Sequence, residues 1–165
     1  MRRTAILSFI FIAGALLGCG EKTGKDSNTT TTSEEIEEEK VEANPKGIGA
    51  VQNVTLTDPL EESMIKSGKA IYEMKCSACH KLTDQRVVGP GWAGITNKRR
   101  PEWIMNMITN VDVMLAEDPV AQKLLEECLT RMPNQGVAIG DARDILEFMR
   151  KNDLEQVNSK DEAVN

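Results

Sequence analysis

Two thiols and an imidazole lie within five consecutive residues near the middle of the chain. Cys76 and Cys79 are three residues apart, and His80 follows the second cysteine directly. Cysteines at this spacing share one face of a helical turn, so both sulfur atoms can be bonded to a single group. Three chemistries use such a spacing: a thiol–disulfide exchange pair, half of a zinc site, and the C-x-x-C-H attachment motif of a c-type haem.

The rest of the sequence separates these three chemistries. A thioredoxin-like pair belongs to a strand–helix–strand pattern, and the chain shows no strand alternation. A structural zinc site needs four ligands, usually from two such pairs, whereas His80 is the only histidine. We therefore interpret Cys76 and Cys79 as forming thioether bonds to the vinyl groups of one haem c. His80 is then the predicted proximal ligand of its iron.

A second histidine cannot occupy the sixth position on the iron, because the chain has only one. Lysine, methionine or an open position remain. Most of the 8 methionines fall in expected helices, where core packing is their ordinary role. Met132 instead opens a segment, 132–136, that Pro133 keeps out of helix and that can fold over a haem face. Met132 is the predicted distal ligand, and Met114 is the reserve candidate.

Helices are expected to position this site, and the fold class is predicted as all-α, with about four to five helices around one haem. Gly68 lies inside the first helix, which suggests the close approach of another helix. Asp58 is expected to cap this first helix, with Pro59 in its first position and Glu61 completing a capping box. The expected helices run from Asp58 to about Lys75, from Pro101, from Asp118-Pro119, and from about Asp141 to Lys151.

From about Leu60 to Arg150 the sequence resembles class I cytochrome c. Gly68 and Tyr72 before the C-x-x-C-H motif, then Val88-Gly89-Pro90, then Met132-Pro133 and a closing helix with Phe148 carry the resemblance. In that family the proline carbonyl accepts the second N–H of the proximal histidine, which fixes the ring and raises its basicity. The resemblance thus implies that Pro90 orients His80.

Two features depart from the family pattern. Trp92 replaces a leucine often found there, and the stretch between Asn110 and Leu129 is longer than in minimal members. Trp103 is a candidate for a place beside the haem: it either donates its N–H to a haem propionate or is a half-buried core residue.

The N-terminus resembles a bacterial lipoprotein signal. Arg2 and Arg3 precede an apolar segment, 5–17, and Leu16-Leu17-Gly18-Cys19 is similar to a lipobox. The resemblance implies cleavage before Cys19 and lipidation of that cysteine, and hence a protein anchored to a membrane of the cell envelope and facing the periplasm or exterior. The predicted organisation is a signal peptide at 1–18, a lipidated acidic tether at 19–57, a cytochrome c domain at 58–153, and a polar, frayed tail at 154–165.

Two further features have open interpretations. Cys128 stands among leucines, so we predict a small buried apolar side chain rather than a reactive thiol. Lys98-Arg99-Arg100 is the one dense basic run, which either docks an acidic partner, pairs with haem propionates or is solvated. The net charge of −6 makes nucleic acid an unsuitable partner.

The predicted function is the transfer of single electrons between redox protein partners, such as a respiratory reductase or oxidase, without enzymatic activity or a small-molecule substrate. The segments 103–107 and 114–119 resemble monohaem lipoprotein cytochromes that accompany nitrous-oxide-reducing systems. The alternative is a small haem peroxidase, or a haem subunit of a redox enzyme. It requires an open sixth position on the iron.

Overall fold

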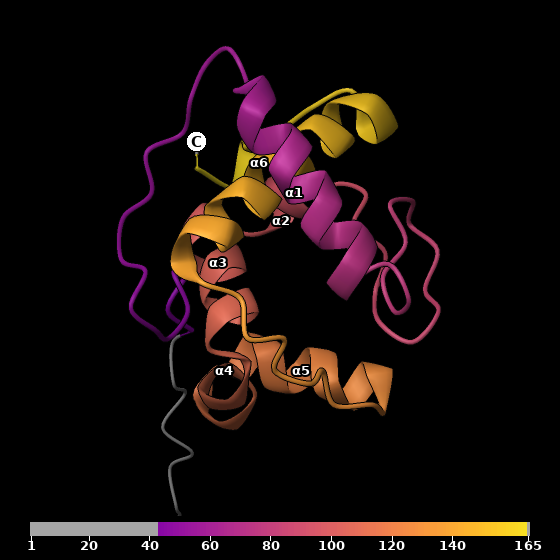
Figure 1. Ribbon diagram of the computed structural model, residues 1–165. Coiled ribbons are helices and arrows are strands. Elements are labelled where there is room, and N and C mark those ends of the chain that lie inside the picture. The colour runs from indigo at the N-terminus through magenta and orange to yellow at the C-terminus, as the bar shows by residue number, and fades with distance from the viewer. Residues whose placement is uncertain (1–42, 165) are drawn as a thin grey trace, which may run out of the picture. The chain divides into compact units, whose positions relative to one another are not determined.

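The computed structural model describes residues 43–164 and builds them from helices. Within that range there is no strand, and one isolated bridge pairs His80 with Arg86. The predicted all-α class is confirmed. The elements are α1 (Glu62–Lys75), α2 (Ile95–Lys98), α3 (Pro101–Thr109), α4 (Val111–Glu117), α5 (Pro119–Cys128), α6 (Ile139–Val157) and the 3-10 helix η1 (Glu162–Val164) (Figure 1).

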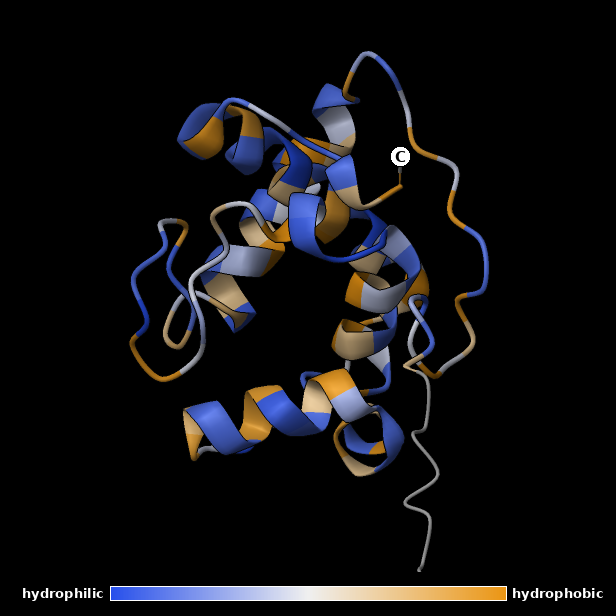
Figure 2. Ribbon diagram, turned by 180° about the vertical axis from the view of Figure 1, so that it is seen from behind, coloured by the Kyte–Doolittle hydropathy of each residue, from blue (hydrophilic) through white to orange (hydrophobic). Residues whose placement is uncertain are grey.

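The helices are amphipathic, and their apolar faces meet in one core. Figure 2 shows apolar and polar residues alternating in bands along the helices, as expected when each helix has one face buried. The main helix–helix contact joins α1 to α6. Gly68 is buried in this contact, and a Cβ atom there would lie 2.1 Å from the carbonyl oxygen of Asp144. Only glycine permits this approach, which confirms the prediction for Gly68.

The start of α1 differs from the expectation. The helix begins at Glu62, and the side chain of Glu61, not that of exposed Asp58, accepts the backbone N–H of Ser63. The reason lies in α6, because the carboxylate of Glu147 accepts the N–H of Glu61 at 3.0 Å and the hydroxyl of Thr57 at 2.7 Å. These bonds hold residues 57–61 against α6, outside the helix.

Helix α6 is longer than predicted at both ends. It starts at Ile139 and continues to Val157, past the expected end near Lys151. The two residues after Lys151 are buried: the amide of Asn152 donates to the carbonyl of Leu82 at 2.9 Å, and Asp153 is fully buried. In the sequence these polar residues look like a solvated helix end, so their tertiary partners were not foreseen.

The middle of the chain largely follows the prediction. Helix α3 begins at Pro101, and α5 begins at Pro119, with the carboxylate of Asp118 accepting the N–H of Ala121 at 2.8 Å. Helix α4 was not predicted. It fills part of the long stretch after Asn110, and its Met114 is fully buried.

The tether was predicted to reach Thr57, but packed structure begins earlier. The side-chain amide of Asn106 in α3 donates to the carbonyls of Lys46 and Val51, at 3.0 and 2.9 Å, and accepts the N–H of Val51 at 3.0 Å. Asn106 is fully buried, so these bonds with segment 44–51 satisfy an otherwise unpaired amide. Figure 1 shows the segment, in indigo, running outside α3 toward the start of α1.

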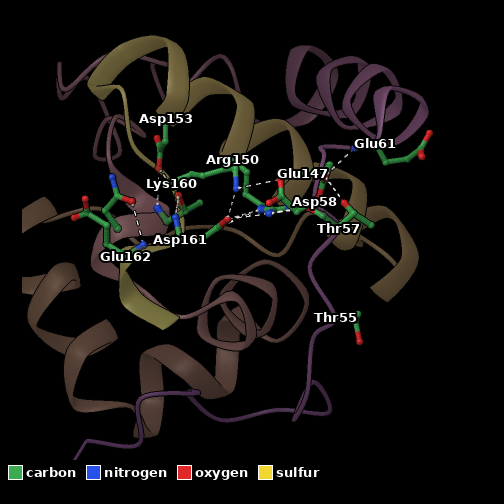
Figure 3. A network of polar contacts seen from close by, with 12 residues as sticks. Thr55, Thr57, Asp58, Glu61, Glu147, Arg150, Asp153, Lys160, Asp161 and Glu162 are labelled. Carbon is green, nitrogen blue, oxygen red and sulfur yellow. Dashed lines mark hydrogen bonds and ion pairs between the residues drawn. The ribbon is translucent and has the colours of Figure 1, made fainter. Parts of the chain in front are cut away.

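The tail beyond α6 is also more ordered than predicted. The guanidinium of Arg150 donates to both carboxylate oxygens of Asp161, at 2.8 to 3.0 Å, and to the carbonyl of Thr57 at 3.0 Å (Figure 3). Asp161 thereby ties the tail to α6, so the expectation of a frayed tail is wrong over residues 154–164.

Between residues 43 and 164, no helix is both long and apolar enough to cross a membrane. The predicted signal peptide at 1–18, the lipidation residue Cys19 and the tether up to residue 42 lie outside the described residues.

Candidate cofactor site

The C-x-x-C-H motif continues the end of α1 as one further turn. The N–H of Cys76 bonds to the carbonyl of Tyr72 at 2.9 Å, and the N–H groups of Cys79 and His80 both bond to the carbonyl of Cys76. Both cysteines are free thiols and half-buried. Burial raises the pKa of the Cys76 thiol, which Lys75 partly offsets. The motif thus presents two thiols and an imidazole from one short turn.

The imidazole of His80 has a fixed orientation. Its Nδ1 lies 2.8 Å from the carbonyl oxygen of Pro90. A carbonyl can only accept a hydrogen bond, so Nδ1 carries the proton and the lone pair of Nε2 is free for a metal. Burial lowers the pKa of His80, and the bond to Pro90 only partly opposes this, so the ring is held in the neutral form that a ligand requires. This is the contact that the resemblance implies between Pro90 and His80.

Glycine allows the loop after the motif to fold back onto the imidazole. A Cβ atom on Gly89 would lie 2.4 Å from Cε1 of His80. The N–H of Gly89 bonds to the carbonyl of Cys79 at 2.9 Å, which holds the loop in place. Trp92 follows, with its ring centroid 4.8 Å from that of Tyr72 and 5.7 Å from that of His80. The tryptophan that departs from the family pattern therefore packs directly beside the imidazole.

A cavity of about 430 Å³ opens beside the motif. Its volume falls within the roughly 300–1,000 Å³ of typical small-molecule and cofactor sites. Cys79 and His80 line it, together with Met132 from the loop between α5 and α6. The rest of the wall is mostly apolar and comes from α3 to α6, chiefly Ile104, Met107, Ile108, Leu115, Leu124, Leu125 and Met149.

This cavity fits a covalently held haem. A flat apolar ring requires apolar walls, and the cavity has them together with the thiol of Cys79 and an imidazole with a free Nε2. Cys76, three residues earlier in the same turn, packs against the hydrophobic core and does not itself line the cavity. Within residues 43–164 no group of three or more His, Cys, Asp or Glu side chains could hold a metal ion, so no competing zinc site exists there.

The two candidate methionines, Met132 and Met114, lie in different surroundings. Met132 is half-buried and lines the cavity with His80. Met114 is fully buried, its sulfur accepts the N–H of Ile48 at 3.1 Å, and it is not part of the cavity wall. Met107 and Met149 also line the cavity, from within α3 and α6, which the sequence did not reveal. Of these three cavity-lining methionines, Met132 is the one that belongs to a loop.

The indole N–H of Trp103 has a protein acceptor in the structure. Its Nε1–H donates to Oδ1 of Asp118 at 3.2 Å, and only 4% of the residue is exposed. Asp118 is completely buried, and its second oxygen, Oδ2, has no hydrogen-bond partner. A buried carboxylate is costly without donors, so the bond from Trp103 to Oδ1 stabilises it. This bond favours the core interpretation of Trp103, and the residue also lines the cavity.

Cys128 is half-buried and free, and it lines the cavity at the end of α5. The prediction of a small packed side chain holds only in part, because the cysteine faces the site rather than a sealed core. A signal was available in the sequence. Ala121, Leu124, Leu125 and Cys128 follow the spacing of one helix face, so the cysteine shares the face of the apolar residues.

These features define a class of protein: a small helical domain with one covalent haem held beside a C-x-x-C-H turn. The family model for cytochrome c matches residues 65–153. The chain belongs to the cytochrome c family, and its single motif makes it a monohaem member that binds one haem c with its iron.

Solved structures agree with this assignment. Cytochrome c from Rhodothermus marinus is similar at 32% identity and a TM-score of 0.65, covering 68% of this chain and 96% of that one. An engineered form from the same organism, Rma TDE, is 30% identical with a TM-score of 0.63, covering 67% and 98%. The same engineered protein bound to a carbene intermediate is 29% identical with a TM-score of 0.60, covering 67% and 98%. No curated protein matches the chain.

Proposed function

We propose that the protein carries single electrons through a haem attached at Cys76 and Cys79 and ligated by His80 and Met132. Haem-based electron transfer is the function of the family. The observation that carries the ligand assignment is the shared cavity, which joins a pre-oriented imidazole and a loop methionine within one apolar wall.

The proximal side is built to keep the ligand still. The carbonyl of Pro90 holds the His80 ring, and Tyr72 donates its hydroxyl to the backbone carbonyl of His80 at 2.8 Å. When bound, the haem supplies a one-electron iron couple. A rigid ligand limits reorganisation when the iron changes charge, which suits electron transfer.

The distal loop is held at several points. Lys75 at the end of α1 donates to the carbonyl of Gln135 at 3.0 Å, and Arg131 pairs with Asp112 of α4 at 3.2 Å. Within the loop, the side chain of Asn134 accepts the N–H of Gly136 at 2.9 Å. These bonds keep Met132 at the cavity. A thioether in the sixth position closes the iron to other ligands and raises the reduction potential.

The location proposal depends on the lipobox-like residues Leu16-Leu17-Gly18-Cys19. A lipidated Cys19 would anchor the protein to a membrane of the cell envelope, outside the cytoplasm, since several acyl chains give stable anchoring. Respiratory reductases or oxidases are then suitable partners, including a nitrous-oxide-reducing system. Cys19→Ala should release a cytochrome with an unchanged visible spectrum. A variant that stays with membranes after a high-salt wash would contradict the anchor.

The alternative function is catalysis at an open iron. The carbene-bound neighbour shows that an engineered member of this fold can hold a reactive ligand. For this chain, that chemistry requires the thioether of Met132 to leave the iron.

One experiment separates the two functions. With Met132 as ligand, the oxidised protein shows the weak long-wavelength band of methionine-ligated ferric haem, and the reduced protein binds carbon monoxide poorly. Met132→Ala should abolish the band, lower the potential and open the iron, while the haem stays covalently attached. The matched control is Met107→Leu, because Met107 lines the same cavity. This variant should retain the band. If the unaltered protein binds carbon monoxide readily and Met132→Ala changes nothing, the ligand assignment fails.

A further inference from the structure

A second cavity, of about 350 Å³, lies where α2 meets α3. Its charged lining residues are all cationic: Lys98, Arg99 and Arg100. The nearest compensation is Glu102, a buried carboxylate that lies 3.4 Å from Arg100 and 3.7 Å from Lys46. Within residues 43–164, Lys98 and Arg99 have no ion-pair partner, so the cavity keeps a net positive charge.

Trp103 connects this cavity to the haem cavity. Among the residues that the structure describes, it is the one that lines both. Arg99 places its guanidinium 5.3 Å from the centroid of the indole ring, and Asp118 accepts the indole N–H. An aromatic ring held by a stacked cation and a buried acceptor has little freedom to move.

The acidic groups near the basic cavity do not neutralise it. Asp153 is buried and accepts the N–H groups of Gly94 and Thr96, both at 2.8 Å. Glu162 in η1 is exposed and does not line the cavity. Burial raises the pKa of Asp153, and Lys98 lies close enough to offset part of that rise, but the two form no ion pair. An approaching anionic surface therefore meets an exposed Lys98 and an Arg99 that have no ion-pair partner within residues 43–164.

We propose that this basic cavity docks a carboxylate-rich face of the redox partner protein, and that electrons pass to or from the haem through the indole of Trp103. The inference rests on the proposed electron-transfer function. One electron leaves the reduced partner and reduces the haem iron, or the reverse, and no bond is made or broken. Tunnelling rates fall steeply with the distance between donor and acceptor, and they fall less steeply through packed atoms than across empty space or solvent. An indole that lines both cavities supplies such packed atoms. Unpaired cations at its outer side speed the encounter with an anionic partner.

The rival docking region is the edge of the haem cavity beside Cys79. It also carries cations, but Arg86 there is paired with Glu127 at 3.5 Å. Lys81 follows the motif directly and is exposed, as Lys98 is. These two lysines form a matched pair for charge reversal, one at each region.

The test measures electron exchange of the full haem-loaded chain with two small probes in stopped flow across ionic strength. Hexacyanoferrate is anionic and stands in for the carboxylate-rich face, and hexaammineruthenium is cationic. Lys98→Glu should slow the reaction with the anionic probe several-fold at low salt, with the difference vanishing at high salt, and should leave the potential unchanged. Lys81→Glu should have a clearly smaller effect.

A second variant tests the indole itself. Trp103→Phe keeps an aromatic ring but loses the bond to Asp118. This variant should slow electron exchange with the anionic probe more than exchange with the cationic probe. A purely structural role would change both rates together. The inference is overturned if Lys81→Glu slows the anionic probe as much as Lys98→Glu. It is also overturned if Lys98→Glu shifts the reduction potential, because the cation would then pair with the haem. If the unaltered protein exchanges electrons with neither probe, the proposed function itself fails.

Discussion

Helix α6 joins two regions of opposite character. At one, Met149 lines the haem cavity among apolar side chains. At the other, Glu147 and Arg150 form a buried ion pair at 2.8 Å, with side-chain exposures of 0% and 1% (Figure 3). Both regions lie within one turn of the same helix.

The two regions are stabilised by different physics. Burial of apolar surface against a bound group stabilises the cavity region, and apolar packing of this kind tolerates changes of side-chain shape. The ion pair adds little stability compared with apolar side chains of the same volume. Removing one partner, however, is costly, because it leaves a buried charge without a partner. The charged region therefore specifies which segments meet: Thr57 before α1 and Asp161 after α6 are both bonded to Arg150.

The largest expected effect comes from removing the central cation. Arg150→Met should lower the free energy of unfolding by about 3–5 kcal/mol, because Glu147 and Asp161 lose their shared partner. Unfolding of the haem-loaded protein by denaturant measures this, and the visible spectrum of the folded protein should not change. Lys151→Met, at the next and more exposed position, should stay within about 0.5 kcal/mol. Equal stability of the two variants would show that the network contributes little.

An acid titration tests the same region more gently. Burial by itself would raise the pKa of Glu147, but hydrogen bonds from Thr57, Arg143, the N–H of Glu61 and Arg150 outweigh it and lower the pKa to about 2. A carboxylate whose pKa is depressed on folding adds stability above its unfolded pKa. That stability is lost as pH falls from about 4.5 toward 2, and it amounts to about 3 kcal/mol.

Asp153 contributes with the opposite sign. Burial raises its pKa, and hydrogen bonds from Thr96 and Gly94 offset this only in part. Its proton is therefore bound more readily in the folded state, so it adds some stability as pH falls through its raised pKa toward its ordinary value.

Glu147→Gln should flatten the loss of folding stability below pH 4.5, whereas Glu155→Gln, on an exposed side chain, should not. An unchanged acid profile in Glu147→Gln would contradict the assignment.

The contrast also explains what the sequence could predict. The attachment turn, the Pro90 contact and the glycine at the α1–α6 contact depend on local spacing or on motifs, and the structure contains these contacts. The charged region could not be predicted, because Glu147, Arg150 and Asp153 sit in a helix where charged residues normally face solvent. Their partners are remote in sequence: Arg150 and Thr57 are 93 residues apart.

At the site, the uncertain residues were those whose role depends on tertiary burial. Trp103 had two open interpretations, and its bond to the buried carboxylate of Asp118 favours the core role; the sequence showed Asp118 only as a helix cap. The short helices α2 and α4 were missed because each is too brief to show a clear apolar period.

The smallest expected effect is at the cavity, where Cys128→Ala removes one partly buried sulfur. The cost should be about 1 kcal/mol or less in the free energy of unfolding, with haem content and spectrum retained. Thiol counting sharpens the result. In a chain with Cys19→Ala, the unfolded holoprotein should show one reactive thiol, because the thioether bonds remove Cys76 and Cys79. The folded protein should react slowly, since Cys128 faces the cavity wall rather than open solvent. Three thiols in the unfolded state would contradict covalent attachment of the haem. Labelling as fast in the folded protein as in the unfolded one would place Cys128 at the surface. A small loss of stability in Cys128→Ala would then reflect exposure of the side chain and not tolerant apolar packing at the cavity.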